Sequence, residues 1–395
     1  MTGSPHLRDF GHEPDPDLLD LLRTLANVAS GTDAGRNLVI AAAAGNVDKG
    51  IQKLLPLVRG SAELFPQLPA EAQRGIERRY LKARNAFVRL DATARTLATA
   101  LAEAGIPVLF LKGFALACRF YPSPAQRPMG DLDLAVPHQH YERAADVLQR
   151  LGFVEARPFS EHRRAIAGLS THAFPFRSDA RQVNLDLHYN ILNCSLWEGA
   201  DDGFWAAAEP LGQPGFGSAL TLAPEHHLFH ACIHGYSRSL LQLSIRWMLD
   251  AHFLLARSGP GFRWSLVETE ATRHRCGPLL AATLAYLAEN LASPIPAEVL
   301  DRLSAQDMPQ FDRAFFRDTA QLAEAAGFGR RIAIAWNACQ RQVGHRFATP
   351  VPFIRQMARR WGVTSPRQLV AEATRHLSEP SFMRQKRRRS TPGAR

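Results

Sequence analysis

Two aspartates in one short alternating segment are the residues of this sequence best placed to do chemistry. Acidic and apolar side chains alternate in Gly130-Asp131-Leu132-Asp133-Leu134, as in a strand with one buried face. Asp131 and Asp133 would then share a face, about 6.6 Å apart along the strand. Because two fixed carboxylates repel each other unless a cation lies between them, the pair predicts a site for Mg²⁺ bound together with substrate phosphates. A half-buried edge strand with exposed acids is the alternative interpretation.

A second predicted strand, residues 183–188, carries a third acid. Its apolar residues alternate with Asn184, Asp186 and His188, so these three polar side chains share a face. If this strand lies near the first, Asp186 completes a cluster of three carboxylates that can hold two metal ions for in-line phosphoryl or nucleotidyl transfer. Asp186 could bind a metal, act as the general base, or do both. His188 could orient a substrate phosphate or simply pair with Asp186.

The third candidate is a turn from a strand into a helix. Residues 106–111 form an apolar run that predicts a buried strand, and residues 114–121 predict a helix. Lys112 and Gly113 lie between them, where a glycine allows a phosphate close to the backbone and the N–H groups that begin a helix favour an anion. Arg127, in the proline-rich loop that follows, is a candidate phosphate clamp. The alternatives are an ordinary turn with Lys112 in solvent, and a surface arginine.

Other constellations are less specific. His226, His230 and His234 recur every four residues and could bind Zn²⁺ if a fourth ligand came close, although packing and hydrogen bonding against the sheet domain is the favoured interpretation of such a stripe. His234 or Arg246 could instead line an acceptor pocket. Asp250 lies one helical turn after Arg246, which predicts a structural ion pair between them. The sequence has no P-loop, no Rossmann G-x-G-x-x-G and no G-x-S-x-G.

The elements that must position these residues fall into four predicted regions. Residues 1–95 form an N-terminal helical region, whose last helix begins at residue 70 and runs to about residue 104. Residues 96–200 mix strands and helices, residues 201–345 are helical, and residues 346–395 form a loosely packed basic tail. Beyond the elements already named, the patterns predict strands at 152–156 and 172–176, a hairpin turn at 177–182, and helices at 141–151, 224–234, 239–256, 264–273 and 278–291.

Composition limits the class of protein. The chain has 395 residues, 46% hydrophobic and 21% charged, which is typical of a globular protein of two or three modules and excludes collagen, coiled coils and wholly disordered chains. No apolar run reaches the ~18 residues that a membrane span needs. The first 20 residues hold no apolar signal core, and five scattered cysteines suit a reducing compartment, so a cytoplasmic protein is expected.

The charge balance is basic. The formal net charge is +10, and part of the excess lies in residues 384–389. A basic surface favours polyanions, whether nucleic acid, nucleotide or anionic lipid. A solvated tail is the plainer interpretation of such a charge run, so a nucleic-acid partner is possible but not favoured.

Taken together, these motifs resemble the uncharacterised nucleotidyltransferase family of the DNA polymerase β superfamily. The resemblance covers about residues 85–290. Its core is carried by Leu111-Lys112-Gly113, Tyr121-Pro122, Arg127-Pro128 and Gly130-Asp131-Leu132-Asp133-Leu134. Downstream it is carried by Leu185-Asp186-Leu187-His188, by the segment 222–225, and by His230, His234-Gly235 and Arg246-Trp247-Met248-Leu249-Asp250.

The resemblance implies an α+β fold, a minimal nucleotidyltransferase mixed sheet flanked by helices, with Mg²⁺ and a nucleoside triphosphate donor. By position, Asp131 and Asp133 match the metal-binding pair and Asp186 matches the third carboxylate. Lys112-Gly113 stands where the wider superfamily has a Gly-Ser turn that binds the triphosphate. The sequence departs from that pattern, because no serine follows Gly113 and 17 residues separate Gly113 from Asp131, more than is usual.

The expected function is therefore transfer of a nucleotidyl group, AMP from ATP, to a hydroxyl or phosphate of an unknown small-molecule or peptide acceptor. Asp131, Asp133 and Asp186 would hold one or two Mg²⁺ ions, with Asp186 also activating the acceptor. Lys112, Gly113, Arg127 and His188 would bind the nucleotide. The alternatives are modification of a protein or RNA, a degenerate fold that binds a nucleotide or partner without catalysis, and a nucleic-acid-binding protein that uses its basic tail.

Overall fold

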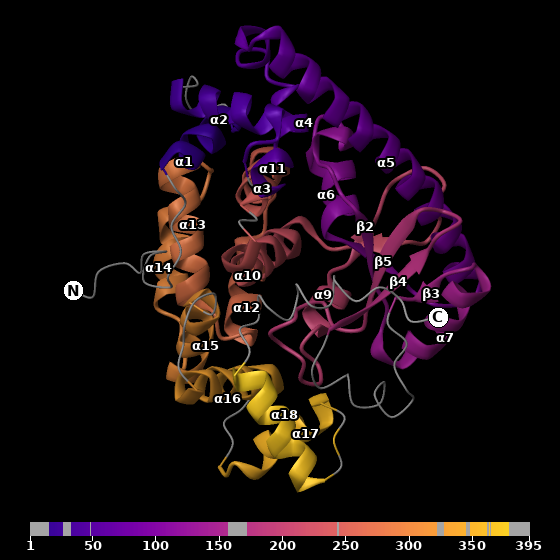
Figure 1. Cartoon of the computed structure of the whole chain (residues 1–395), viewed down its shortest axis with the longest axis vertical. Helices are drawn as coiled ribbons and strands as arrows, with labels where there is room; N and C mark the ends of the chain where they lie inside the picture. Colours follow the sequence, from indigo (N-terminus) through magenta and orange to yellow (C-terminus); the bar gives the residue numbers. More distant parts are fainter. Residues whose placement is uncertain are drawn as a thin grey trace.

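A mixed β-sheet lies between helices from the first 150 residues on one side and helices that follow residue 200 on the other (Figure 1). The computed structural model describes residues 16–26, 33–47, 49–156, 172–242, 245–321, 328–344, 348–361, 363 and 365–378. The basic run at 384–389 lies outside these residues. The fold is α+β, as the sequence predicts.

The sheet has seven strands in the order β3-β4-β5-β2-β1-β7-β6. The central pair that carries the acids, β2 and β5, is parallel, as is the pair β1 and β7, whereas the remaining neighbours are antiparallel. The strands are β1 (Leu109–Leu111), β2 (Asp131–Ala135), β3 (Val154–Glu155), β4 (Ala173–Ser178), β5 (Val183–His188), β6 (Glu209–Pro210) and β7 (Leu220–Thr221). The last two strands follow residue 200, so the sheet extends beyond the segment in which the sequence pattern predicts strands.

The two faces of the sheet differ in character because side chains alternate along each strand. Leu132 and Leu134 of β2 and Leu185 of β5 point into a core with the helices α5 (Ala70–Glu103) and α7 (Tyr141–Arg150). The acidic positions of β2 and β5 therefore face the opposite side, towards α10 (Pro224–Gln242) and α11 (Arg246–Ser258). Figure 1 shows α5 and α7 on one side of the strands and α10 on the other.

The N-terminal helices precede the sheet and end in the long helix α5. This helix begins at the predicted residue 70 and ends where Gly105 adopts a left-handed conformation (φ 65°). Before α5 come α1 (Pro16–Leu25), α2 (Asp33–Ala44), α3 (Lys49–Gln52) and α4 (Leu55–Val58), and after β1 comes α6 (Lys112–Phe120).

The C-terminal half is helical, but the single helix predicted for residues 239–256 is wrong. The chain instead ends α10 at Gln242 and begins α11 at Arg246, and the two helices pack against each other. Gly235 permits this packing, because a Cβ there would collide with the indole of Trp247. The other helices are α9 (Asp202–Ala206), α12 (Trp264–Arg273), α13 (Gly277–Leu291), α14 (Ala297–Ser304), α15 (Gln310–Gln321), α16 (Phe328–Val343), α17 (Val351–Trp361) and α18 (Pro366–Ser378).

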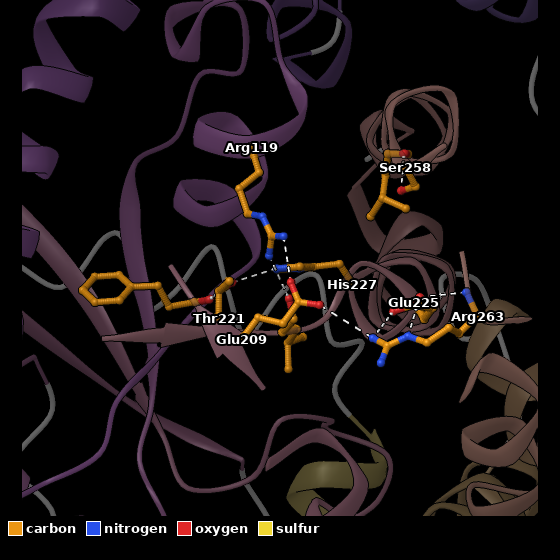
Figure 2. A network of polar contacts seen from close by, with 10 residues as sticks. Arg119, Glu209, Thr221, Glu225, His227, Ser258 and Arg263 are labelled. Carbon is orange, nitrogen blue, oxygen red and sulfur yellow. Dashed lines mark hydrogen bonds and ion pairs between the residues drawn. The ribbon is translucent and has the colours of Figure 1, made fainter. Parts of the chain in front are cut away.

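A polar network joins the edge of the sheet to these helices (Figure 2). Arg119 of α6 donates a hydrogen bond of 2.9 Å to Glu209 of β6. Arg263, at the start of α12, lies 3.6 Å from Glu209 and forms an ion pair of 3.1 Å with the buried Glu225 of α10. The network fixes α10 and α12 against the sheet. These helices therefore have a defined position beside the face of the sheet that carries the acids.

Two further observations bear on the class of protein. All five cysteines are free thiols. Within the described residues, no helix is both long and apolar enough to cross a membrane.

Candidate functional site

The parallel pairing of β2 with β5 brings the predicted acids together. Its register places Asp133 opposite Asp186 and Asp131 opposite Asn184. Donor atoms of Asp133, Asp186 and His188 all lie within 4.8 Å of one another. Asp131 is exposed at the start of β2 and is not part of this compact group. The compact group is thus two carboxylates and an imidazole rather than three aspartates.

One oxygen of Asp133 is the centre of the site. The Lys112 Nζ atom donates a hydrogen bond of 2.7 Å to Asp133 Oδ1, and His188 Nε2 lies 3.0 Å from the same oxygen. Lys112 Nζ and His188 Nε2 are 3.3 Å apart. Asp186 is half-buried and has no hydrogen bond or ion pair to the described residues. The site therefore holds two neighbouring carboxylates, Asp133 paired with Lys112 and Asp186 without an ion pair in the described part of the chain.

The electrostatics of the site favour a charged carboxylate and a neutral imidazole. Burial alone would raise the pKa of Asp133, but the Lys112 ammonium and the His188 ring outweigh it and hold that pKa below its usual value. Burial, followed by the Lys112 charge, lowers the pKa of His188 despite the opposing effect of Asp133. A neutral His188 keeps a nitrogen lone pair, which is the form that binds metals.

The turn into α6 is built differently from the expected phosphate-binding glycine turn. Lys112, not Gly113, adopts the left-handed conformation (φ 46°), which is uncommon for a residue with a side chain. Gly113 is buried in the first turn of α6, where a Cβ would lie 2.9 Å from Arg127 Nη1 and 3.4 Å from Met129 Cβ. Gly113 is thus needed for the close approach of the loop before β2.

Arg127 is buried rather than at the surface, and it pairs with Asp250. Its Nε and Nη2 atoms each donate a hydrogen bond of 2.7 Å to the two oxygens of Asp250, and the Tyr121 hydroxyl donates a third of 2.6 Å. The Arg127 Nη1 atom is buried with no hydrogen-bond partner within the described chain. Arg127 thus ties α11 to the loop before β2 and leaves one donor unused beside Gly113.

The predicted ion pair between Arg246 and Asp250 is wrong. Arg246 Nη1 instead donates a hydrogen bond of 2.6 Å to the carbonyl oxygen of Pro128, and Arg127 takes the carboxylate. Helical spacing places Arg246 near Asp250, but it cannot reveal a competing arginine 123 residues away. Burial lowers the pKa of Arg246 and the charges of Asp250 and Asp131 oppose that effect, so Arg246 lies near the exposed acid of β2.

The three histidines of α10 do not act as one set. His226 packs against Phe204, with ring centroids 5.0 Å apart, and lies 3.9 Å from Glu270. His230 stacks on His234 with centroids 5.0 Å apart, and His234 is 6.3 Å from His172, whose ring is 4.9 Å from His188. Two of the three therefore line the site. Only tertiary structure could separate them, because all three have the same helical spacing.

The donor set fits a divalent cation. Two carboxylates and one neutral imidazole lie close enough to share an ion, and Asp186 has no other partner to give up. Carboxylate oxygens suit Mg²⁺ and Mn²⁺, and an imidazole nitrogen extends the set towards transition metals. Across the described ranges this is the one group of three or more His, Cys, Asp or Glu donors with that spacing, so the alternative of a zinc site on α10 has no support.

The mixed sheet with its flanking helices is consistent with a nucleotidyltransferase fold. The model of the uncharacterised nucleotidyltransferase family matches residues 51–292, and the chain belongs to this family. Membership of this family supports transfer of a nucleoside monophosphate from a nucleoside triphosphate as the general class of reaction. A search of curated proteins gives no match.

Proposed function

We propose that this protein is a Mg²⁺-dependent nucleotidyltransferase that moves AMP from ATP to a hydroxyl or phosphate of a small-molecule or peptide acceptor. The observation that carries the proposal is the group formed by Asp133, Asp186 and His188 on adjacent parallel strands. The family match supports the reaction class, and the chemistry of the side chains supports the roles below.

Asp133, Asp186 and His188 would hold the ion, and Asp131 would add a carboxylate from the exposed end of the same strand face. When bound, Mg²⁺ would neutralise charge on the phosphates and make the acceptor hydroxyl easier to deprotonate. Asp186, which has no partner among the described residues, would take the proton from the acceptor. The acceptor oxygen then bonds to the α-phosphorus as the bond to the bridging oxygen breaks, and pyrophosphate leaves.

The triphosphate would lie at the start of α6. The first N–H groups of that helix favour an anion, and Lys112 and Gly113 are its first two residues. Of the Arg127 donors, only Nη1 is available, because Asp250 engages the others. Arg246, near Asp131, is a second cation suited to phosphate. His188 would contact both the ion and the nucleotide.

The acceptor would approach from the side of α10. His172, His230 and His234 extend from His188 as a series of ring contacts. These side chains can donate and accept hydrogen bonds and can stack on planar groups, which suits a polar organic acceptor. Five free cysteines favour a reducing compartment, and we place the reaction in the cytoplasm.

The test is transfer of label. The protein is incubated with Mg²⁺, each of the four nucleoside triphosphates labelled at the α-phosphate, and the small-molecule fraction of a cell extract. The expected result is one labelled product, a conjugate of AMP distinct from free ATP, ADP and AMP, formed from ATP with one pyrophosphate released per label. Asp133→Asn should form no such product and release no pyrophosphate. No label transfer together with no Mg²⁺-dependent binding of any of the four nucleotides would overturn the proposal.

A second candidate is a nucleotide-binding protein without transfer activity. It is favoured by one observation, that Lys112 already engages Asp133 while Asp131 stands apart from the compact group. This candidate predicts ATP binding that does not depend on Mg²⁺ and is unchanged in Asp133→Asn, with no pyrophosphate release. The same pair of assays therefore separates the two candidates.

A further inference from the structure

Lys112 is held by the atoms that a metal ion would need. Its Nζ atom lies 2.7 Å from Asp133 Oδ1 and 3.3 Å from His188 Nε2. These two side chains supply two of the three donors in the compact group, with Asp186 as the third. A positive charge on Lys112 therefore lies beside two of the three donors of the group.

Two cations cannot share that place at low cost. Asp133 and Lys112 are largely buried, with side-chain exposures of 9% and 15%. Like charges a few ångströms apart in a partly buried site repel each other strongly. A divalent ion would also take the Asp133 oxygen lone pairs that Lys112 uses, at the shorter distance of ~2.1 Å.

Lys112 can give up this contact without disturbing the fold. Its backbone is fixed, because Leu111 pairs with Asp133 across the sheet and α6 begins at Lys112. Its side chain is a flexible four-carbon stem with a compact charge at the end. The ammonium can therefore turn from Asp133 towards the start of α6, where the backbone N–H groups favour an anion.

We propose that Lys112 competes with the divalent ion for Asp133, and that the triphosphate resolves the competition by drawing the ammonium to itself. Metal binding is then weak in the free protein and strong once a nucleotide is present. By thermodynamic reciprocity, the metal strengthens nucleotide binding by the same factor. This inference rests on the proposed function, because it takes the ligand at α6 to be a triphosphate.

The test measures Mn²⁺ binding by electron paramagnetic resonance, with and without α,β-methylene-ATP, which cannot release pyrophosphate. In the wild type, the analogue should strengthen Mn²⁺ binding at least tenfold, within the usual range of coupling between sites. Lys112→Met keeps the length of the side chain but not its charge. It should bind Mn²⁺ at least tenfold more tightly than the wild type without the analogue, and the analogue should then add less than twofold.

Two variants serve as controls. Lys82→Met removes an exposed lysine of α5 that has no hydrogen bond or ion pair to the described residues, and it should bind Mn²⁺ as the wild type does. Lys112→Arg keeps the charge and should keep weak binding in the free protein. It also guards against misfolding of the methionine variant, because a shared loss of far-ultraviolet circular dichroism would identify damage to the turn.

Each result decides one question. If Lys112→Met is folded and binds Mn²⁺ no more tightly than the wild type, the competition is refuted while the nucleotidyltransferase site stands. If Lys112→Arg binds free Mn²⁺ as tightly as Lys112→Met, the charge is not the cause and the inference also fails. If no variant binds Mn²⁺ even with the analogue, the proposed function itself fails.

Discussion

Asp133 on β2 and Asp250 on α11 are both buried carboxylates paired with a basic side chain, yet their surroundings differ. Asp250 receives hydrogen bonds from Tyr121 and from two nitrogens of Arg127, so both of its oxygens are engaged by donors in fixed positions. Asp133 is bound through one oxygen by the flexible Lys112, and the unpaired Asp186 lies close by. Both oxygens of Asp250 are therefore occupied by fixed donors, whereas Asp133 can exchange Lys112 for another cation.

The difference separates stability from function. A buried pair in which one partner is removed leaves an uncompensated charge, which is strongly destabilising. Two carboxylates that face each other beside one ammonium are instead suited to a ligand of higher positive charge. We therefore expect Asp250 to matter mainly for folding and Asp133 mainly for catalysis.

The largest expected effect is on activity at Asp133. Asp133→Asn should lower the rate of pyrophosphate release at least a thousandfold, about 4 kcal/mol of transition-state stabilisation, because a ligand to the ion is lost. Its free energy of unfolding should change by less than about 1 kcal/mol. Asp146→Asn, at an exposed position of α7, is the matched control. A rate of pyrophosphate release by Asp133→Asn within tenfold of the wild type would contradict the expectation that Asp133 acts mainly in catalysis.

The next effect is on stability at Asp250. Asp250→Asn should lower the free energy of unfolding by about 3–5 kcal/mol, because the buried Arg127 guanidinium loses its counter-charge. Urea unfolding followed by circular dichroism measures the change, again against Asp146→Asn. A loss of unfolding free energy below about 1 kcal/mol would show that the ion pair of Asp250 contributes little to stability.

A third buried aspartate sharpens the comparison, because it has no basic partner among the described residues. Burial raises the pKa of Asp201 from 3.8 to about 7, although its carboxylate accepts hydrogen bonds from the Ile191 N–H and the Asn190 amide. Its folded pKa thus exceeds its unfolded pKa. Its contribution to stability is full below about pH 4 and is lost as the pH rises through 7.

The wild type should therefore lose about 2–4 kcal/mol of stability from Asp201 between pH 4 and pH 8. Asp201→Asn cannot ionise and should unfold with a flatter pH dependence, so that it gains on the wild type as the pH rises. Urea unfolding at pH 5, 6, 7 and 8 measures the difference between the two proteins. Parallel curves would contradict the shifted pKa.

The smallest expected effect is on stability at Gly113, where the turn beside Asp133 contacts Arg127, the partner of Asp250. Gly113→Ala places a Cβ 2.9 Å from Arg127 Nη1, and Arg127 cannot easily move because Asp250 holds it. We expect a loss of about 1 kcal/mol, against the small gain that alanine usually brings to a helix. Gly130→Ala is the control, because a Cβ there meets nothing within 4 Å. Equal stabilities for the two variants would refute the tight contact.

Much of the site could be predicted from local patterns. Alternation alone places Asp133 and Asp186 on the polar faces of their strands, and the strand Val183–His188 has the predicted bounds. Alternation has a period of two, so it fixes which face a side chain takes. The long helix α5 also begins at the predicted residue, because its apolar positions recur over many turns.

Partners that are distant in the sequence could not be predicted this way. The register of β2 against β5 places Asp133 opposite Asp186, and the side-chain positions then make His188, rather than Asp131, the third member of the compact group. The pairing of Arg127 with Asp250 joins residues 123 positions apart, and the contact of Lys112 with Asp133 depends on a side-chain conformation. These contacts follow from tertiary packing, which no local period encodes.

The most direct test of the central claim is calorimetric titration of ATP, with and without Mg²⁺, into the wild type and into the double variant Asp133→Asn/Asp186→Asn. The account predicts that Mg²⁺ strengthens ATP binding to the wild type at least tenfold and has no effect on the double variant. Binding that is equal in the two proteins, or independent of Mg²⁺ in the wild type, would contradict a metal-dependent nucleotidyl-transfer site at these residues.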